Sequence, residues 1–115
     1  MRLRSDIFVS ALVRRVFSAG GFAAVVAKGA EEAGAIFVRQ RFRDGLESVY
    51  GPAPQTFAQQ DTGLRRFEAR LARAEVSAVD AVVAREARFD SDLWVVELEV
   101  EEIGDLLDIV KPDGM

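Results

Sequence analysis

The sequence of 115 residues contains no cysteine and no histidine. Disulfide bonds, thiolate nucleophiles and structural zinc sites are therefore excluded, and so is the side chain that most often serves as a general base. Any catalysis would have to use Asp, Glu, Arg, Lys, Ser, Thr or Tyr, and any bound metal would be a hard cation held by oxygen ligands. We expect no cofactor and favour a protein that is not an enzyme.

A long apolar run is also missing. The uncharged stretch at residues 16–27 is far shorter than the ~20 apolar residues of a membrane helix, and it contains Gly20 and Gly21. Asp6 and the pair Arg14 and Arg15 interrupt the region where the apolar part of a signal peptide would lie. We therefore expect no membrane association and a cytoplasmic location.

What is present is typical of one globular domain spanning residues 1–115, because 50% of the residues are hydrophobic and 30% are charged. The net charge of −4 is uneven: most of the basic residues precede residue 89, whereas residues 89–115 are strongly acidic. This asymmetry could steer a partner, but we favour an acidic segment that packs beside the arginine-rich body.

Two helices are predicted. The first spans residues 6–19 with Ser5 as its N-cap, and its polar positions form only a thin stripe, so we expect it to be mostly buried. The second runs from Ser77 to about Arg88, because Ser77 and Asp80 have the spacing of a capping box.

Five strands are predicted at residues 22–28, 35–43, 46–51, 65–72 and 93–101, and the first four are expected to form a meander. Asp44 and Gly45 predict a two-residue hairpin turn, which would place Tyr50 opposite Arg39. Residues 53–64 resemble a surface loop, and the acidic extension at 102–115 predicts a short return strand or a helical turn. The predicted fold class is α+β, with a mainly antiparallel sheet of about five strands packed with two helices in the order α-β-β-β-β-α-β.

Several ordered motifs resemble one family of short alphaproteobacterial proteins, known as domain of unknown function fourteen-ninety-one. These motifs are Ser5-Asp6-Ile7, Arg14-Arg15, Gly34-Ala35-Ile36-Phe37-Val38, Gly51-Pro52-Ala53-Pro54 and Phe89-Asp90-Ser91-Asp92-Leu93-Trp94. The resemblance covers nearly the whole chain, from Ser5 to about Glu99. It implies no activity, cofactor or partner, because the family has none assigned.

Three carboxylates are candidate ligands or acid/base groups. Asp90 and Asp92 lie two residues apart between the second helix and the last strand, where they could hold Mg²⁺ or Ca²⁺ or form a turn by bonding to backbone amides. Glu86 interrupts the apolar stripe of the second helix, so it must pair with an arginine, escape at the helix end or stay neutral in a cleft.

A basic face is predicted on the sheet. Arg39, Arg41 and Arg43 alternate along one strand on the same face as Phe37, and the candidate face also includes Arg66 and Arg70. Arginines interleaved with aromatic residues are typical of single-stranded nucleic-acid platforms. We favour arginines that bond to acidic residues on neighbouring strands, and we consider nucleic acid an unlikely partner because the net charge is negative.

Three functional hypotheses follow. The first is a non-enzymatic interaction or accessory domain that forms a homo-oligomer or binds a protein partner through the sheet edge or the loop at 53–64. The second is a site for a small molecule or divalent metal ion, with hydrolytic activity as one version, built on Glu86, Asp90 and Asp92. The third is single-stranded nucleic-acid binding by the arginine face.

Overall fold

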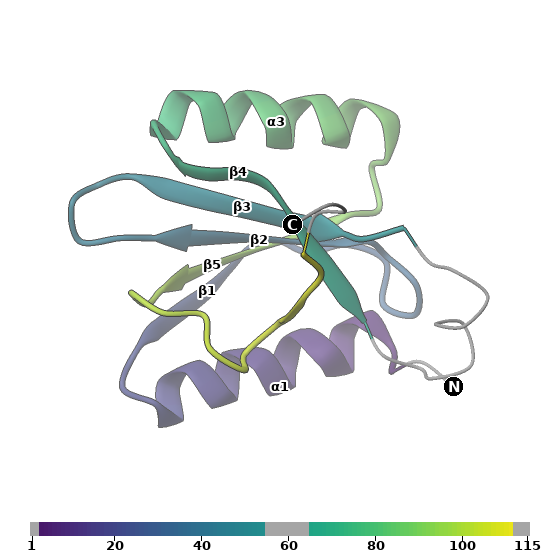
Figure 1. The fold of residues 1–115 in the computed structure, drawn as a ribbon. Coiled ribbons are helices and arrows are strands. Elements are labelled where there is room, and N and C mark those ends of the chain that lie inside the picture. Colours follow the sequence, from purple (N-terminus) through teal and green to yellow (C-terminus); the bar gives the residue numbers. More distant parts are fainter. Residues whose placement is uncertain (1–2, 55–64, 112–115) are drawn as a thin grey trace.

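The computed structural model describes residues 3–54 and 65–111, and in this part of the chain two helices cover opposite faces of a six-stranded sheet (Figure 1). The helices are α1 (Ser5–Ser18) and α3 (Val76–Phe89). The strands are β1 (Phe22–Ala27), β2 (Ile36–Arg41), β3 (Glu47–Pro52), β4 (Arg66–Ala74), β5 (Trp94–Glu99) and β6 (Asp108–Ile109). The predicted loop at 53–64 lies mostly outside the described residues.

The strand order is β1-β5-β2-β3-β4-β6. The pairs β2–β5 and β4–β6 are parallel, and the other three pairs are antiparallel, so the predicted α+β class and mainly antiparallel sheet are confirmed. The predicted meander is wrong in its first step, because β5 lies between β1 and β2. Val95 and Val96 are both buried, Val95 in the core under α3 and Val96 in the core under α1, so this part of β5 is covered on both faces.

The hairpin between β2 and β3 differs from the prediction by one residue. Val38 lies opposite Tyr50 and Arg39 lies opposite Val49, because the connection is a three-residue loop instead of a two-residue turn. The amide of Gly45 donates to the carbonyl of Phe42 at 3.0 Å, and Gly45 adopts a φ of +90°. This is a turn followed by a left-handed residue, a geometry that favours glycine. The shift sends Tyr50 to the α1 face of the sheet.

The N-terminus of α1 is capped by a loop from elsewhere in the chain. Ser5 is the first helical residue and not the predicted N-cap, and its buried hydroxyl donates to the carbonyl of Gly34 at 2.6 Å. The free amides of Ser5 and Asp6 donate to the carbonyls of Glu32 and Glu31. Loop 29–34 thus satisfies the backbone donors that a side-chain cap would otherwise have satisfied.

The predicted capping box of α3 is also wrong. The helix begins at Val76 after Glu75, and no side chain caps it. Asp80 instead reaches the sheet, where its carboxylate lies 2.8 Å from the guanidinium of Arg39. The sequence pattern predicts that the Asp80 carboxylate bonds to the helix backbone, but in the structure it pairs with Arg39 on the sheet.

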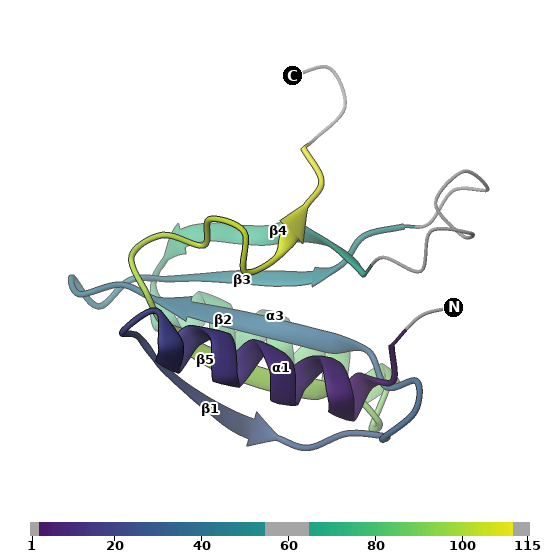
Figure 2. The same ribbon diagram turned by 90° about the horizontal axis from the view of Figure 1, so that it is seen from below.

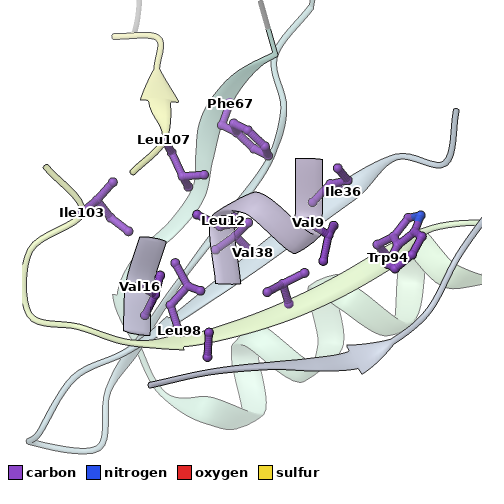
Figure 3. Close-up of a cluster of buried hydrophobic side chains, with 12 residues drawn as sticks. Val9, Leu12, Val16, Ile36, Val38, Phe67, Trp94, Leu98, Ile103 and Leu107 are labelled. Atoms are coloured by element: carbon purple, nitrogen blue, oxygen red, sulfur yellow. The ribbon is translucent and has the colours of Figure 1, made fainter. Parts of the chain in front are cut away.

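The larger core lies between α1 and the sheet (Figure 3). Its buried side chains come from α1, four strands and the C-terminal segment, and they include Val9, Leu12, Val16, Ile36, Val38, Phe67, Trp94, Leu98, Ile103 and Leu107. Ile103 and Leu107 of the C-terminal segment close this core, and the segment contains the two-residue strand β6, which pairs with β4. Within the described residues, no helix is long and apolar enough to cross a membrane.

Candidate functional site

The arginines of β2 are held inside an ion-pair network beneath α3. The carboxylate of Glu47 is completely buried and lies 2.7 Å from the guanidinium of Arg39 and 3.1 Å from that of Arg41. Burial opposes the charge of Arg39, but hydrogen bonds to Glu47 and Asp80 outweigh it and raise the pKa of this group. Arg41 lies 3.7 Å from Glu97. These two cations are therefore paired within the protein.

Arg70 of β4 forms a second network on the same face. Its guanidinium lies 2.8 Å from Glu86 and 3.0 Å from Glu68, donates to the carbonyl of Pro52 at 2.8 Å, and stacks over the ring of Phe37. The carboxylate in the apolar stripe of α3 is thus paired with a strand arginine, one of the alternatives that the sequence left open.

The two remaining arginines of the candidate face lie apart from these networks. Arg66 pairs with Asp108 of β6 at 3.4 Å. Arg43 lies in the hairpin loop and lines, with Arg41, a hollow of about 570 Å³ whose wall also carries Glu99, Glu101 and Glu102. Charges of both signs share this wall, so it offers no field of one sign to a phosphate backbone.

The aspartates after α3 form a turn. The amide of Asp92 donates to the carboxylate of Asp90 at 2.9 Å, and both residues are exposed. No group of three or more acidic side chains among the described residues could hold a metal ion. Glu86, Asp90 and Asp92 therefore do not converge on one site in this part of the chain.

The free edge of the sheet at β1 was not singled out in the sequence. Three of its six side chains, those of Phe22, Val25 and Val26, are 44–59% exposed. Phe17 of α1 is 50% exposed and makes an edge-to-face contact with Phe22, with ring centroids 5.5 Å apart. The prediction that α1 is mostly buried is wrong here, because β1 is an edge and nothing in the described structure covers its outer side.

A groove of about 530 Å³ runs along this edge between α1 and β1. Figure 2 shows α1 lying across the sheet with β1 at its margin. The groove is lined by α1 and β1 side chains and by the central tryptophan, among them Val9, Ser10, Val13, Val25, Lys28 and Trp94. β1 contains no charged residue, whereas edge strands are commonly protected by charges. We call the exposed side chains of β1 together with Phe17 the β1 surface.

The sequence of β1 is compatible with the β1 surface but does not predict it. Residues 22–27 read FAAVVA, with no alternation between polar and apolar residues. Such a run suits either a central strand or an exposed apolar edge, and only the position of β5 decides between them. A bulge between Val25 and Ala27 bends the strand, as is common at sheet edges.

Comparison with known proteins establishes the family. The profile of a family described as a protein of unknown function, DUF1491, matches residues 3–108. The chain belongs to the DUF1491 family. The solution structure of a protein from A. tumefaciens is 62% identical, with a TM-score of 0.88 and full coverage of both chains. The crystal structure of a DUF1491 protein from Caulobacter crescentus is 32% identical, with a TM-score of 0.78, and covers 96% of this chain and 100% of that one. No curated protein matches the sequence.

Three of the motifs that resemble DUF1491 meet around loop 29–34, namely Ser5-Asp6-Ile7, Gly34-Ala35-Ile36-Phe37-Val38 and Phe89-Asp90-Ser91-Asp92-Leu93-Trp94. The indole N–H of Trp94 donates to the carbonyl of Ala30 at 2.8 Å. The backbone amide of Trp94 donates to the carbonyl of Ala35 at 2.7 Å. A Cβ on Gly34 would lie 2.5 Å from the carbonyl oxygen of Asp92, so only glycine fits there. These contacts give the DUF1491 motifs a role in holding loop, helix and sheet together.

Proposed function

We propose that this DUF1491 chain is a non-enzymatic interaction domain whose β1 edge accepts an extended apolar segment of a protein as an additional strand. The observation that carries the proposal is the β1 surface, an uncharged edge strand with half of its side chains exposed. Strand addition uses the unpaired backbone groups of an edge for affinity and neighbouring pockets for specificity.

The groove beside β1 supports the same mode of binding. It lies on the α1 face of the edge, so alternate side chains of an added strand would enter it while the others face the α3 side. Val9, Val13 and Val25 provide apolar walls, and Lys28 lies at the end of the strand. The occupant that fits is an extended segment with apolar side chains.

The other edge of the sheet is a poor alternative. β6 has two residues and pairs only with Arg66 and Phe67, and the rest of this edge belongs to β4, which carries Glu68, Arg70 and Arg73. Short, charged edges disfavour pairing with another chain.

The pairing of the arginines supports an interaction domain over the other two hypotheses. Arg39 and Arg70 bond to acidic side chains of the same chain, and Asp90 bonds to the backbone of Asp92. The bacterial origin of the similar structures supports our further proposal of a bacterial protein, for which we retain a cytoplasmic location.

The proposal is tested by titrating the isotope-labelled chain with synthetic extended peptides that alternate Val and Thr and carry terminal lysines. Binding is followed by amide chemical shifts and hydrogen exchange. We expect shifts and new amide protection at residues 22–28. Val26→Lys should abolish them, because the lysine at this exposed edge position repels the peptide's lysines and blocks close packing.

Phe89→Lys is the matched control. It also replaces an exposed apolar side chain by lysine, but Phe89 lies at the end of α3, outside β1. This variant should bind as the unaltered chain does. Peptide binding that survives Val26→Lys, or amide shifts confined to other strands, would show that β1 is not the contact surface.

A further inference from the structure

We infer that the strand added to β1 is β1 of a second copy of this chain, so that two copies form one continuous sheet about a two-fold axis. This inference rests on the proposed function and names the occupant of the same edge. In an antiparallel pair with two-fold symmetry, each contact occurs twice. With the axis at Ala24, Ala23 of one copy lies opposite Val25 of the other, within the regular part of the strand before the bulge.

The residues of β1 suit pairing with themselves. Such a register places the small Ala23 beside the β-branched Val25 on both sides of the axis. The small Ala23 and Ala24 lie at the centre, where two strands approach most closely. Identical charges would repel each other across a two-fold axis, and β1 has none. The bulge after Val25 limits the regular pairing to the first part of the strand.

Helix α1 enlarges the contact. A stable interface buries roughly 1,200–2,000 Å², more than a short strand alone supplies. Phe17 projects beside Phe22, and Val13 lines the groove along β1, so both side chains lie at the margin that a second copy would cover. The side chains of the second β1 that face α1 would enter this groove.

The charges of α1 match those of an antiparallel second α1. Asp6, Ser10 and Arg14 line the same groove and follow one another at one-turn intervals. A two-fold axis near Ser10 places Asp6 of each copy, which also pairs with its own Arg4 at 3.2 Å, against Arg14 of the other, with the small serines between them. Ser10 and Val25 share this groove, so one axis can pass close to the middle of both elements.

The first experiment measures molar mass by sedimentation equilibrium from micromolar to millimolar concentration. We expect reversible dimers in the unaltered chain and in Phe89→Lys. Val26→Lys should raise the dissociation constant at least about tenfold, because two lysines would lose hydration within one contact. Dimers that persist unchanged in Val26→Lys would overturn the inference, since another surface would then hold them.

The second experiment determines where the two-fold axis of the dimer lies. Because the chain has no cysteine, a single introduced one reports on one position. Ala24→Cys, treated with a short bismaleimide, should give a covalent dimer, and adding Val26→Lys should suppress it. Ala84→Cys, on the exposed side of α3, is the control and should stay monomeric. Equal cross-linking of both cysteines would overturn the assignment of the axis to β1.

The two proposals fail in different ways. A chain that is monomeric at millimolar concentration but binds the Val/Thr peptide at β1 would overturn self-pairing and leave the proposed interaction edge in place. A monomer that also fails to bind the peptide would overturn both.

Discussion

The two faces of the sheet are built differently. The face under α1 is a continuous apolar core of twelve buried residues, whereas the face under α3 has five, beside ion pairs centred on the completely buried Glu47. Apolar burial is non-directional, and a buried ion pair requires defined geometry. We conclude that the α1 face supplies most of the stability, and that the α3 face fixes where its helix sits.

The alternation of β2 creates the difference. Ile36 and Val38 join the core under α1, while Phe37, Arg39 and Arg41 face α3. One strand thus supplies hydrophobic residues to one layer and cations to the other. Substitutions that affect one face at a time measure what each face contributes to stability.

The largest effect is expected from Phe67→Ala on the α1 face. Phe67 is 2% exposed and contacts the ring of Phe8. Its removal leaves a cavity in the core and should lower the free energy of unfolding by about 3–5 kcal/mol. Chemical denaturation measures this loss, and Phe89→Ala, at an exposed phenylalanine, should change stability by less than about 0.5 kcal/mol. A loss under 1 kcal/mol for Phe67→Ala would refute the dominance of the α1 face.

Glu47→Ala should have the second largest effect. It leaves Arg39 without its buried partner, but Arg41 is partly exposed and keeps Glu97, so we expect a loss of about 2–3 kcal/mol. Denaturation should be accompanied by faster hydrogen exchange in α3. Glu102→Ala, at an exposed acid after β5, is the control. Exchange in α3 that stays unchanged would contradict the role of this network in fixing the helix.

Glu86→Ala should cost less, about 1 kcal/mol. Its carboxylate is 29% exposed, and Arg70 keeps Glu68 and the carbonyl of Pro52 as partners. Thermal unfolding gives the size of the loss. A loss of 3 kcal/mol or more would mean that the Arg70 network stabilises the fold as strongly as the apolar core does.

The smallest effect is a response to alkaline pH on the α1 face. Burial raises the pKa of Tyr50, so the unfolded chain loses this proton at lower pH than the folded protein does. The free energy of unfolding should therefore fall as pH rises above about 10, and Tyr50→Phe should make that fall shallower. The free energy of unfolding is measured by fluorescence at each pH between 9 and 11. Identical dependence on pH in the two proteins would contradict this assignment.

Local sequence pattern was sufficient to predict the helices and strands, and most predicted bounds agree with the structure within two residues. The strand order was not predicted, because the insertion of β5 between β1 and β2 depends on packing between distant residues. Val95 alternates with Trp94 and Val96 along β5, and its burial under α3 shows that β5 is covered on both faces.

The candidate site shows the same limit. Charge pattern correctly suggested that strand arginines meet acidic partners, but one partner, Glu47, could not be inferred, because the hairpin register was displaced by one residue. The β1 surface could not be predicted either. A strand of Phe, Ala and Val gives no indication of whether another strand lies beside it.

The central position of β5 also governs when the protein can fold during synthesis. β1 and β2 leave the ribosome early, yet the strand that joins them begins only at Trp94. Until then the backbone N–H and C=O groups of β1 and β2 that face β5 have no native partner in the sheet. The sheet can therefore close only after β5 has been synthesised, and we expect a product truncated before Trp94 to leave these edges open to chaperones and proteases.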